Sequence, residues 1–511
     1  MTSAYDTASD RTLWQQARHW AAVRGSEPVI VEHAGGITWQ RYVDETENLR
    51  SRLAAIGVQD QRTAVLALPN ASLTLGLWLA IIANGAIVQA IDVESGPVVF
   101  ERAIRATNPV VVFACPENAK AASEGMSRAE SSARLVVVEH AELDGRYDRL
   151  GLTATASVPA DATADLVAGM LPTSGTSGMP KLVQLTQRNY VMAGERLARN
   201  GGFLAEDRHY LCTPFFHTNG QLYLAVPPFI TGGSIALVPR FSASEYFATA
   251  AKLGVTVSSM VAPPMRLALH KAVERGGPVN AGDLRLIQYG MTLSSADWQE
   301  WDRLVPQIHM RQIYGQTESV TGVLGGSPWE TDDRHTIGRP FIGVPGVRLV
   351  GDDGSDVPDG EPGELWVRGE PGSTLMLGYH DAPEATAQTL VDGQWLRTGD
   401  IMVREPGGRI AFRGRRMHII RRGGENLSTY ALEVDLQACP LVSDVAVTAK
   451  EDDRLDALVV AHVIPDAGFT EQGFLDWCRE NLGKRGVPDE VRVHSSFPRT
   501  GSGRVIAREL G

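Results

Sequence analysis

A segment rich in serine, threonine and glycine offers the clearest chemistry in the chain. It reads LPTSGTSGMPK (171–181). Its hydroxyl groups can hydrogen-bond an anion, its glycines let backbone N–H groups approach that anion closely, and Lys181 adds a positive charge. It lacks the Gly-Lys-Ser/Thr ending of the common phosphate loop, and taken alone it fits a flexible linker equally well. The hydroxyl and glycine residues are Thr173, Ser174, Gly175, Thr176, Ser177 and Gly178.

Four further motifs follow in a fixed order: YGQTES (314–319), RTGD (397–400), GRRMHIIRRGGENLS (414–428) and PRTGSGR (498–504). Together with the first segment they resemble the adenylate-forming superfamily of acyl-CoA synthetases, luciferases and peptide-synthetase adenylation domains. Two stretches, FFHTNGQ (215–221) and YGQTESVTGV (314–323), are most similar to acyl-CoA ligases of the carnitine-CoA ligase type.

The resemblance implies ATP and Mg²⁺ as cofactors, with residues 173–181 as a mobile loop over the β- and γ-phosphates. It implies that Tyr314 stacks on adenine, that Asp400 accepts the ribose hydroxyls and that Arg415 donates to the ribose. It also implies that Thr317 binds the α-phosphate and that Glu318 holds Mg²⁺, whose preferred ligands are oxygen atoms. The remaining nucleotide-binding positions expected from the resemblance are Gly290, Met291, Gly315, Gln316 and Phe412.

His217 follows two phenylalanines at an expected strand end. A histidine in apolar surroundings fits a satisfied core residue, whereas the resemblance implies that it lines and gates the pocket for an acid substrate. The expected walls of that pocket are Asn219, Gly220, Gln221 and Thr292. In the implied reaction, the acid attacks the α-phosphorus of ATP, pyrophosphate leaves, and the adenylate passes to an acceptor such as CoA. The expected catalytic set is Thr317, Glu318, Arg504, His217 and Lys181.

The clear departures from the family pattern lie near the C-terminus. Arg504 stands where the family has a lysine, and arginine is a wider, planar donor. His418 stands at the expected hinge, where an aspartate or lysine is usual, and Gly486 replaces a lysine that often contacts CoA.

Three hypotheses therefore stay open. The first is a ligase that adenylates a small carboxylic acid, aromatic acids included. The second is a diazotase that activates nitrous acid and forms a diazo group on an aromatic amine. The third is a catalytically weak nucleotide-binding relative, which the complete phosphate, magnesium and ribose motifs disfavour.

The elements that must position these residues change in character along the chain. Short β-branched runs bounded by Gly, Pro or Asn predict buried parallel strands at 64–68, 86–91, 109–114, 134–139 and 234–238, and the spacing of apolar residues predicts a helix over 40–57. Asp-Gly and Pro-Gly turns from about residue 343 predict antiparallel strands. We expect an α/β fold. Residues 1–416 would form a large adenylation domain with layered α/β subdomains and a β-barrel-like section, and residues 417–511 a small mobile α+β domain.

Composition narrows the partners and the compartment. The chain has 48 basic and 60 acidic residues, a net charge of −12, which argues against binding nucleic acid. Four cysteines without a CxxC pair predict neither a zinc site nor disulfides and fit a reducing cytoplasm. The uncharged run over 73–91 contains the turn pair Asn84-Gly85, which predicts a buried helix and a strand rather than a membrane span. We expect a cytoplasmic monomer or homodimer with small-molecule partners.

Overall fold

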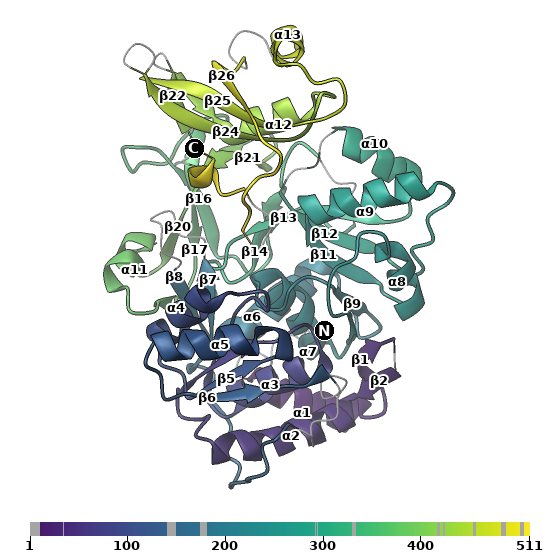
Figure 1. Ribbon diagram of the computed structural model, residues 1–511, viewed down its shortest axis with the longest axis vertical. Helices are drawn as coiled ribbons and strands as arrows, with labels where there is room; N and C mark the ends of the chain where they lie inside the picture. The colour runs from purple at the N-terminus through teal and green to yellow at the C-terminus, as the bar shows by residue number, and fades with distance from the viewer. Residues whose placement is uncertain are drawn as a thin grey trace.

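A computed structural model of the protein describes residues 11–33, 35–140, 150–173, 181–291, 293, 295–329, 334–415, 419–422, 425–452, 456–481, 487–500 and 505–510. Within these residues, two large sheets lie in the lower and middle parts of the molecule, and the C-terminal elements form a separate unit above them (Figure 1).

The first large sheet has the strand order β18-β8-β7-β4-β3-β5-β6. Its strands from β7 to β6 are parallel, whereas β8 and β18 run antiparallel to their neighbours. The strands are β3 (Thr63–Ala67), β4 (Ile87–Ala90), β5 (Val111–Ala114), β6 (Arg134–Val137), β7 (Val167–Thr173), β8 (Lys181–Thr186) and β18 (Gly378–Tyr379). Helices α4 (Pro97–Thr107) and α5 (Pro116–Arg128) share an apolar cluster with β3 and β5.

The second large sheet has the order β15-β14-β13-β12-β11-β9-β10-β1-β2. Its central strands are parallel, and antiparallel strands close each edge. The strands are β1 (Pro28–Glu32), β2 (Gly35–Thr38), β9 (Arg208–Leu211), β10 (Ser234–Leu237), β11 (Val257–Val261), β12 (Leu286–Gly290), β13 (His309–Gly315), β14 (Gly322–Gly325) and β15 (Arg339–Pro340). Helices α8 (Tyr246–Leu253), α9 (Ala262–Arg275) and α10 (Ser295–Leu304) contribute to a second apolar cluster on one face of this sheet.

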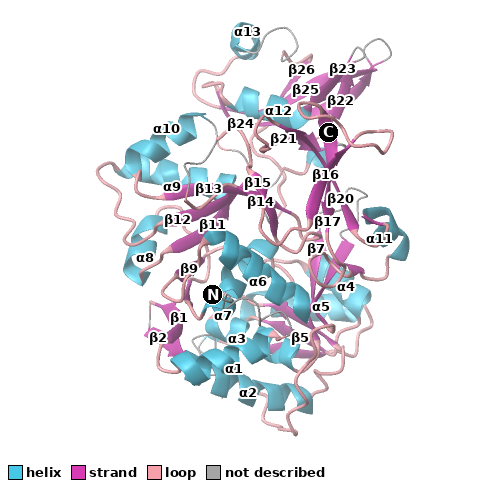
Figure 2. Ribbon diagram, turned by 180° about the vertical axis from the view of Figure 1, so that it is seen from behind, coloured by secondary structure: helices cyan, strands magenta, loops and turns pink. Residues whose placement is uncertain are grey.

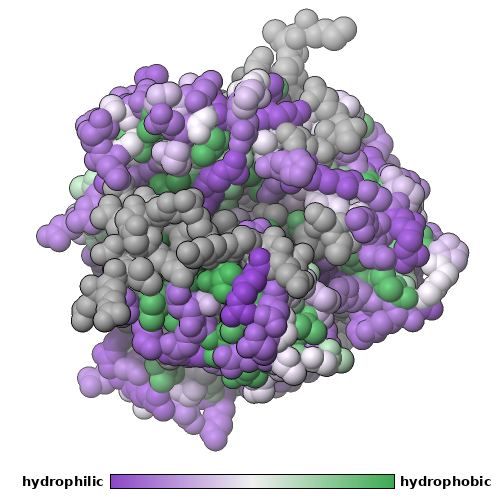
Figure 3. All heavy atoms as spheres, turned by 90° about the horizontal axis from the view of Figure 1, so that it is seen from above, coloured by the Kyte–Doolittle hydropathy of each residue, from purple (hydrophilic) through white to green (hydrophobic). Residues whose placement is uncertain are grey.

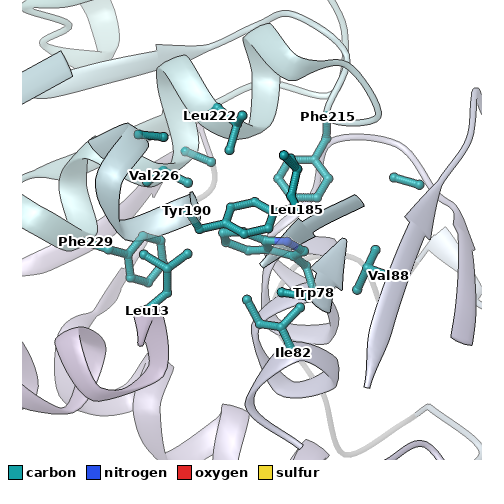
Figure 4. Packing of buried hydrophobic residues seen from close by; sticks show 14 of the residues in the cluster. Leu13, Trp78, Ile82, Val88, Leu185, Tyr190, Phe215, Leu222, Val226 and Phe229 are labelled. Atoms are coloured by element: carbon teal, nitrogen blue, oxygen red, sulfur yellow. The ribbon is translucent and has the colours of Figure 1, made fainter. Parts of the chain in front are cut away.

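A layer of helices shares its core with both large sheets. It consists of α1 (Leu13–Arg24), α2 (Trp39–Ala55), α3 (Ser72–Ala83), α6 (Gln187–Gly201), the π-helix η3 (Asn219–Ala225) and α7 (Val226–Thr231). Trp78 lies at the centre of this layer, with the rings of Tyr190, Phe215 and Phe229 at 5.8, 5.4 and 6.0 Å (Figure 4). Because these rings come from different elements, their packing fixes how the two halves of the large unit meet.

A third, antiparallel sheet joins the large unit to the C-terminal unit. It contains β16 (Gly346–Val350), β17 (Pro362–Arg368), β19 (Leu390–Val391), β20 (Trp395–Arg404) and β21 (Ile410–Arg415), with α11 (Pro383–Thr389) beside it. This sheet is the section expected to resemble a barrel. Strand β20 pairs with β17, β19 and β21, and no pairing between the described strands closes the sheet into a ring.

The C-terminal unit has its own apolar core, which is distinct from the cores of the large unit. Its elements are β22 (Ile419–Arg422), β23 (Glu425–Ser428), α12 (Thr429–Gln437), β24 (Val442–Asp452), β25 (Asp456–Pro465), α13 (Glu471–Asn481), β26 (Glu490–Val493) and a 3₁₀ turn at Ala507–Glu509. The expected large α/β part with a small α+β part is confirmed (Figure 2). The exact boundary at residues 416 and 417 stays a prediction, because residues 416–418 lie outside the described residues.

The run over 73–91 forms helix α3, a turn at Asn84-Gly85 and strand β4, as predicted. Gly85 has φ +71°, a conformation that glycine adopts without strain. No helix in the described ranges is long and apolar enough to cross a membrane. Seen from the C-terminal end, hydrophilic residues cover most of the described surface, and hydrophobic residues form small separate groups (Figure 3).

Candidate functional site

Residues 314–318 leave the end of β13, and their side chains reach three different neighbours. The first neighbour is Asp400. The Tyr314 hydroxyl donates to Asp400 Oδ2 at 2.5 Å, and Gln316 Nε2 donates to the same oxygen at 2.7 Å. Asp400 is only 1% exposed, so these two donors fix the orientation of a buried carboxylate. The structure thus brings together the residues expected to bind adenine and ribose.

Strands β20 and β21 position Asp400. Its backbone pairs in register with that of Arg415 on β21, so both residues expected at the ribose lie at one end of this strand pair. Thr398 Oγ1 accepts a hydrogen bond from the Asp400 N–H at 3.1 Å, and the Thr398 carbonyl accepts one from Gln316 at 2.8 Å. Phe412, also on β21, packs edge-on against Tyr430 of α12 with ring centroids 4.7 Å apart.

The second neighbour is Thr218, whose hydroxyl lies 2.8 Å from the hydroxyl of Thr317. Thr218 follows His217 and precedes the π-helix η3. The prediction that His217 lies at a strand end is wrong: β9 ends at Leu211, and His217 lies in the turn that leads to η3. The apolar run continues past the strand, but Pro214 has no N–H with which to continue the ladder. His217 is partly exposed and packs at a tilt against Phe216, with ring centroids 4.2 Å apart.

The expected pocket-wall residues Asn219, Gly220 and Gln221 form the start of η3. Asn219 joins β11 to the loop that follows β9, because its Nδ2 donates to Ser259 Oγ of β11 at 2.9 Å and its Oδ1 accepts from Thr213 of that loop at 3.0 Å. Gln221 is 1% exposed, and its Oε1 accepts the Tyr190 hydroxyl at 2.9 Å. Gln221 therefore anchors η3 to α6. π-Helical turns often occur at functional sites, and this one begins beside His217 and Thr317.

The third neighbour is Tyr379 of β18. Its hydroxyl donates to Glu318 Oε1 at 2.8 Å, and Lys181 Nζ lies 4.9 Å from the centre of its ring. Burial, and then the adjacent Glu318 carboxylate, raise the pKa of Tyr379 above its ordinary value, so the phenol stays a protonated donor. Sequence reasoning missed Tyr379, because nothing in the local run GYHDAPEAT marks this side chain as a neighbour of residues 181 and 318.

Two further predicted residues lie at the end of β12. Gly290 ends this strand, and Met291 follows with φ +71°, a left-handed conformation unusual for a residue with a side chain. The Met291 carbonyl accepts a hydrogen bond from Gln312 Nε2 on β13 at 2.9 Å, which holds this turn beside the segment that leads to Tyr314. Backbone strain of this kind is often found at ligand-binding sites.

Part of the predicted site lies beyond the described ranges. Thr173 ends β7 and Lys181 begins β8, and the Thr173 hydroxyl donates to the Lys181 carbonyl at 3.4 Å. The predicted positions that lie outside the described residues are Ser174, Gly175, Thr176, Ser177, Gly178, Thr292, His418 and Arg504. The roles assigned to these residues, and to the described ones, toward a nucleotide and an acid stay predictions.

Glu318 is the residue that would hold a divalent cation. Within the described residues, no group of three or more His, Cys, Asp and Glu side chains gathers as a ligand cage. Mg²⁺ is commonly bound by one or two carboxylates together with substrate phosphates and water. One oxygen of Glu318 accepts a neutral phenol donor, so the carboxylate keeps its negative charge and its second oxygen. This donor chemistry fits Mg²⁺ held between Glu318 and phosphate groups.

Comparison with known proteins gives concordant results. The family described as AMP-binding enzyme matches residues 17–380, and the AMP-binding enzyme C-terminal domain matches residues 431–504. The crotonobetaine/carnitine–CoA ligase of Proteus mirabilis (strain HI4320) is 31% identical over 352 residues, which are 68% of this chain and 67% of that protein.

Two solved structures show the same fold at lower identity. The anthranilate CoA ligase AuaEII in complex with anthranoyl-AMP is 21% identical, with a TM-score of 0.87, and the match covers 100% of this chain and 98% of that chain. ATP-bound MatB from Rhodopseudomonas palustris is 23% identical, with a TM-score of 0.85, and the match covers 97% and 98%.

Proposed function

The chain belongs to the family of AMP-binding enzymes and is an AMP-forming, acyl-CoA ligase-like enzyme, and from this premise we propose that it adenylates a small carboxylic acid and passes the acyl group to CoA. Aromatic acids are the leading substrate class. The compared ligase with bound anthranoyl-AMP has the same fold over the whole chain, and anthranoyl-AMP is an aromatic acyl-adenylate.

The observation that carries the proposal is the arrangement around residues 314–318. Within five residues, the chain touches the carboxylate expected at the ribose (Asp400), the threonine beside His217 (Thr218) and the phenol beside Lys181 (Tyr379). All five residues are partly exposed, so a ligand can reach them. A nucleotide laid along this segment would have its nucleoside at Tyr314, its α-phosphate at Thr317 and its outer phosphates toward Glu318.

The proposed chemistry has two steps. A carboxylate oxygen of the acid bonds to the α-phosphorus of ATP while the bond to the bridging oxygen breaks, so pyrophosphate leaves with the electron pair. The thiolate of CoA then attacks the acyl carbon, and AMP leaves. Thr317 and Lys181 would donate to phosphate oxygens, and Arg504 would act as the charged clamp that a lysine supplies in the wider family. Mg²⁺ at Glu318 would neutralise part of the phosphate charge.

The diazotase hypothesis keeps a narrower basis. It depends on Arg504 and on the altered C-terminal motifs, whereas two of the relatives named above are CoA ligases, one of crotonobetaine or carnitine and one of anthranilate. We also propose a cytoplasmic location and a monomeric or homodimeric state. All four cysteines are buried and free, which suits a reducing compartment that holds both ATP and CoA.

Pyrophosphate release tests the proposal. Purified protein with ATP and Mg²⁺ is assayed against a panel of aryl and alkyl acids and nitrite, each with and without CoA. We expect release with at least one aryl carboxylic acid, and formation of the corresponding CoA thioester when CoA is added. Release with nitrite alone would favour the diazotase. A protein that binds ATP and releases no pyrophosphate with any panel member would contradict the proposed activity.

A further inference from the structure

Tyr379 contacts both charged groups expected around the phosphates. Its hydroxyl donates to Glu318 Oε1 at 2.8 Å, and the ammonium of Lys181 lies 4.9 Å from the centre of its ring. A phenol hydroxyl satisfies a carboxylate without neutralising it, and an aromatic face attracts a cation without removing its charge. One side chain therefore stabilises an anion and a cation that remain charged.

The fold holds Tyr379 firmly between these two groups. It pairs with Val183 on β8, two residues from Lys181, and its N–H donates to Thr386 Oγ1 at 2.9 Å. The Met376 N–H, three residues earlier, donates to the Glu318 carbonyl at 2.9 Å. The short segment from Met376 to Tyr379 thus links the backbone of Glu318 to the strand that begins at Lys181. At 8% exposure, the Tyr379 side chain has little room to leave this place.

An ion pair between Lys181 and Glu318 would be harmful to the proposed reaction. Lys181 and Glu318 carry opposite charges and contact the same side chain, one at its ring and the other at its hydroxyl, yet no ion pair joins them in the described part of the chain. A direct pair between them would occupy the carboxylate expected to bind Mg²⁺ and the ammonium expected to bind phosphate, and binding the nucleotide would first require breaking that pair.

We propose that Tyr379 is a positioning residue that holds Glu318 and Lys181 apart, so that Glu318 presents its second oxygen to Mg²⁺ while Lys181 stays available to the phosphates of ATP. This inference rests on the proposed function, since it assumes that the site binds ATP with Mg²⁺. It adds a residue, and a reason for its chemistry, that the motifs around residues 181 and 318 do not contain.

The test measures the dissociation constant of ATP by calorimetry, once in EDTA and once in saturating Mg²⁺, on the full-length chain. The ratio of the two constants is the gain in affinity due to Mg²⁺. Tyr379→Phe removes the hydroxyl and keeps the ring. We expect the gain to fall by about tenfold or more, because a hydrogen bond to a charged group is lost, while affinity in EDTA changes little.

Two companion variants sharpen the measurement. Tyr42→Phe is the matched control, because its hydroxyl is also buried and donates to the Leu75 carbonyl at 2.9 Å, in the helical layer. It should lower the unfolding midpoint to a similar extent without changing the gain. Lys181→Gln tests, at the lysine, whether Lys181 and Glu318 are held apart. Its result does not depend on whether Tyr379→Phe folds. It should weaken ATP binding in EDTA and leave the gain intact, because Lys181 does not compete for Glu318.

Each outcome decides between two claims. If Mg²⁺ does not change the ATP affinity of the wild-type protein, the proposed cation site is wrong, and this inference is wrong with it. A wild type that responds to Mg²⁺ while a folded Tyr379→Phe protein responds equally would overturn this inference alone. A Lys181→Gln protein with a larger gain than wild type would also overturn it, since Lys181 would then be shown to compete with the cation.

Discussion

Asp400 is buried, and one of its carboxylate oxygens accepts two hydrogen bonds. The contribution of its charge to ligand binding can therefore be tested by substitution. Tyr314 and Gln316 both donate to Oδ2, so the carboxylate is oriented before any ligand arrives. Pre-orientation of this kind lowers the entropic cost of binding. In the proposed site, Asp400 accepts hydrogen bonds from the ribose hydroxyls, and its charge strengthens each of them.

Replacing Asp400 with Asn keeps the shape of the side chain and removes the charge. We expect the dissociation constant of ATP, measured by calorimetry, to rise by about 10- to 100-fold, the equivalent of about 1.5–3 kcal/mol for hydrogen bonds to a charged acceptor. Asp356→Asn is the control, because Asp356 is an exposed acid that pairs with Arg348 at 2.6 Å. Equal ATP affinity in a folded Asp400→Asn protein would remove Asp400 from the nucleotide site.

At the scale of elements, the π-helix η3 depends on a glycine at its second residue. A Cβ atom at Gly220 would lie 2.4 Å from the Pro214 carbonyl oxygen and 2.9 Å from Phe215 Cα. Both are backbone atoms, so neither can turn aside as a flexible side chain could. The start of η3 would have to move away from the turn that holds His217.

Gly220→Ala should therefore damage the acid pocket more than the nucleotide site. We expect kcat/KM for the best acid of the panel to fall at least tenfold, stability to fall by about 1–3 kcal/mol from overpacking, and the ATP dissociation constant to stay within about twofold. Gly96→Ala is a suitable control, since a Cβ there meets nothing within 4 Å. Normal turnover of the acid by Gly220→Ala would show that η3 does not shape the pocket.

Local sequence patterns predicted where most helices and strands lie. They did not predict which strands pair or which distant side chains meet. The run at 111–114 is buried and β-branched, and the Asn84-Gly85 pair breaks an apolar stretch, so strand β5 and the end of α3 follow from neighbouring residues. The pairing of β1 with β10, about two hundred residues apart, is set by packing of the whole layer. The contacts of Tyr379 with Glu318 and Lys181 likewise join three distant segments. Motifs indicated Glu318 and Lys181, but no periodicity could indicate the tyrosine between them.

At the scale of the whole molecule, the large unit and the C-terminal unit each bury titratable groups, and burial lowers the pKa of some of these groups and raises the pKa of others. In the large unit, burial lowers the pKa of His209 to about 4, with Asp207 and Arg285 beside it. In the C-terminal unit, burial and then the neighbouring His494 and Arg492 lower the pKa of His462 to about 4, partly countered by Glu490. Burial raises the pKa of Glu433 on α12 to about 7, and burial also raises the pKa of Asp435.

The signs of these shifts predict different behaviour for the two units. An unfolded histidine binds a proton below about pH 6.5, whereas the buried side chain of folded His209 stays neutral down to about pH 4. The free energy of unfolding of the large unit therefore falls by about 2 kcal/mol between pH 7 and pH 5. His462 acts in the same direction in the C-terminal unit. Glu433 acts in the opposite direction there, because the folded state takes up a proton near pH 7 and the unfolded state only near pH 4.5. The two effects offset each other in the C-terminal unit.

Scanning calorimetry at pH 7 and pH 5 can measure this difference. Because the two units have distinct cores, we expect two transitions, and ATP with Mg²⁺ should raise the one that belongs to the large unit. Acidification should lower that transition by a few degrees and move the other much less. His209→Leu should remove the difference between the shifts of the two transitions. His270→Gln, at an exposed position of α9, should leave that difference unchanged. A shift of the large-unit transition that survives His209→Leu would mean that some other group binds the proton, and that the buried imidazole does not govern the acid sensitivity of this unit.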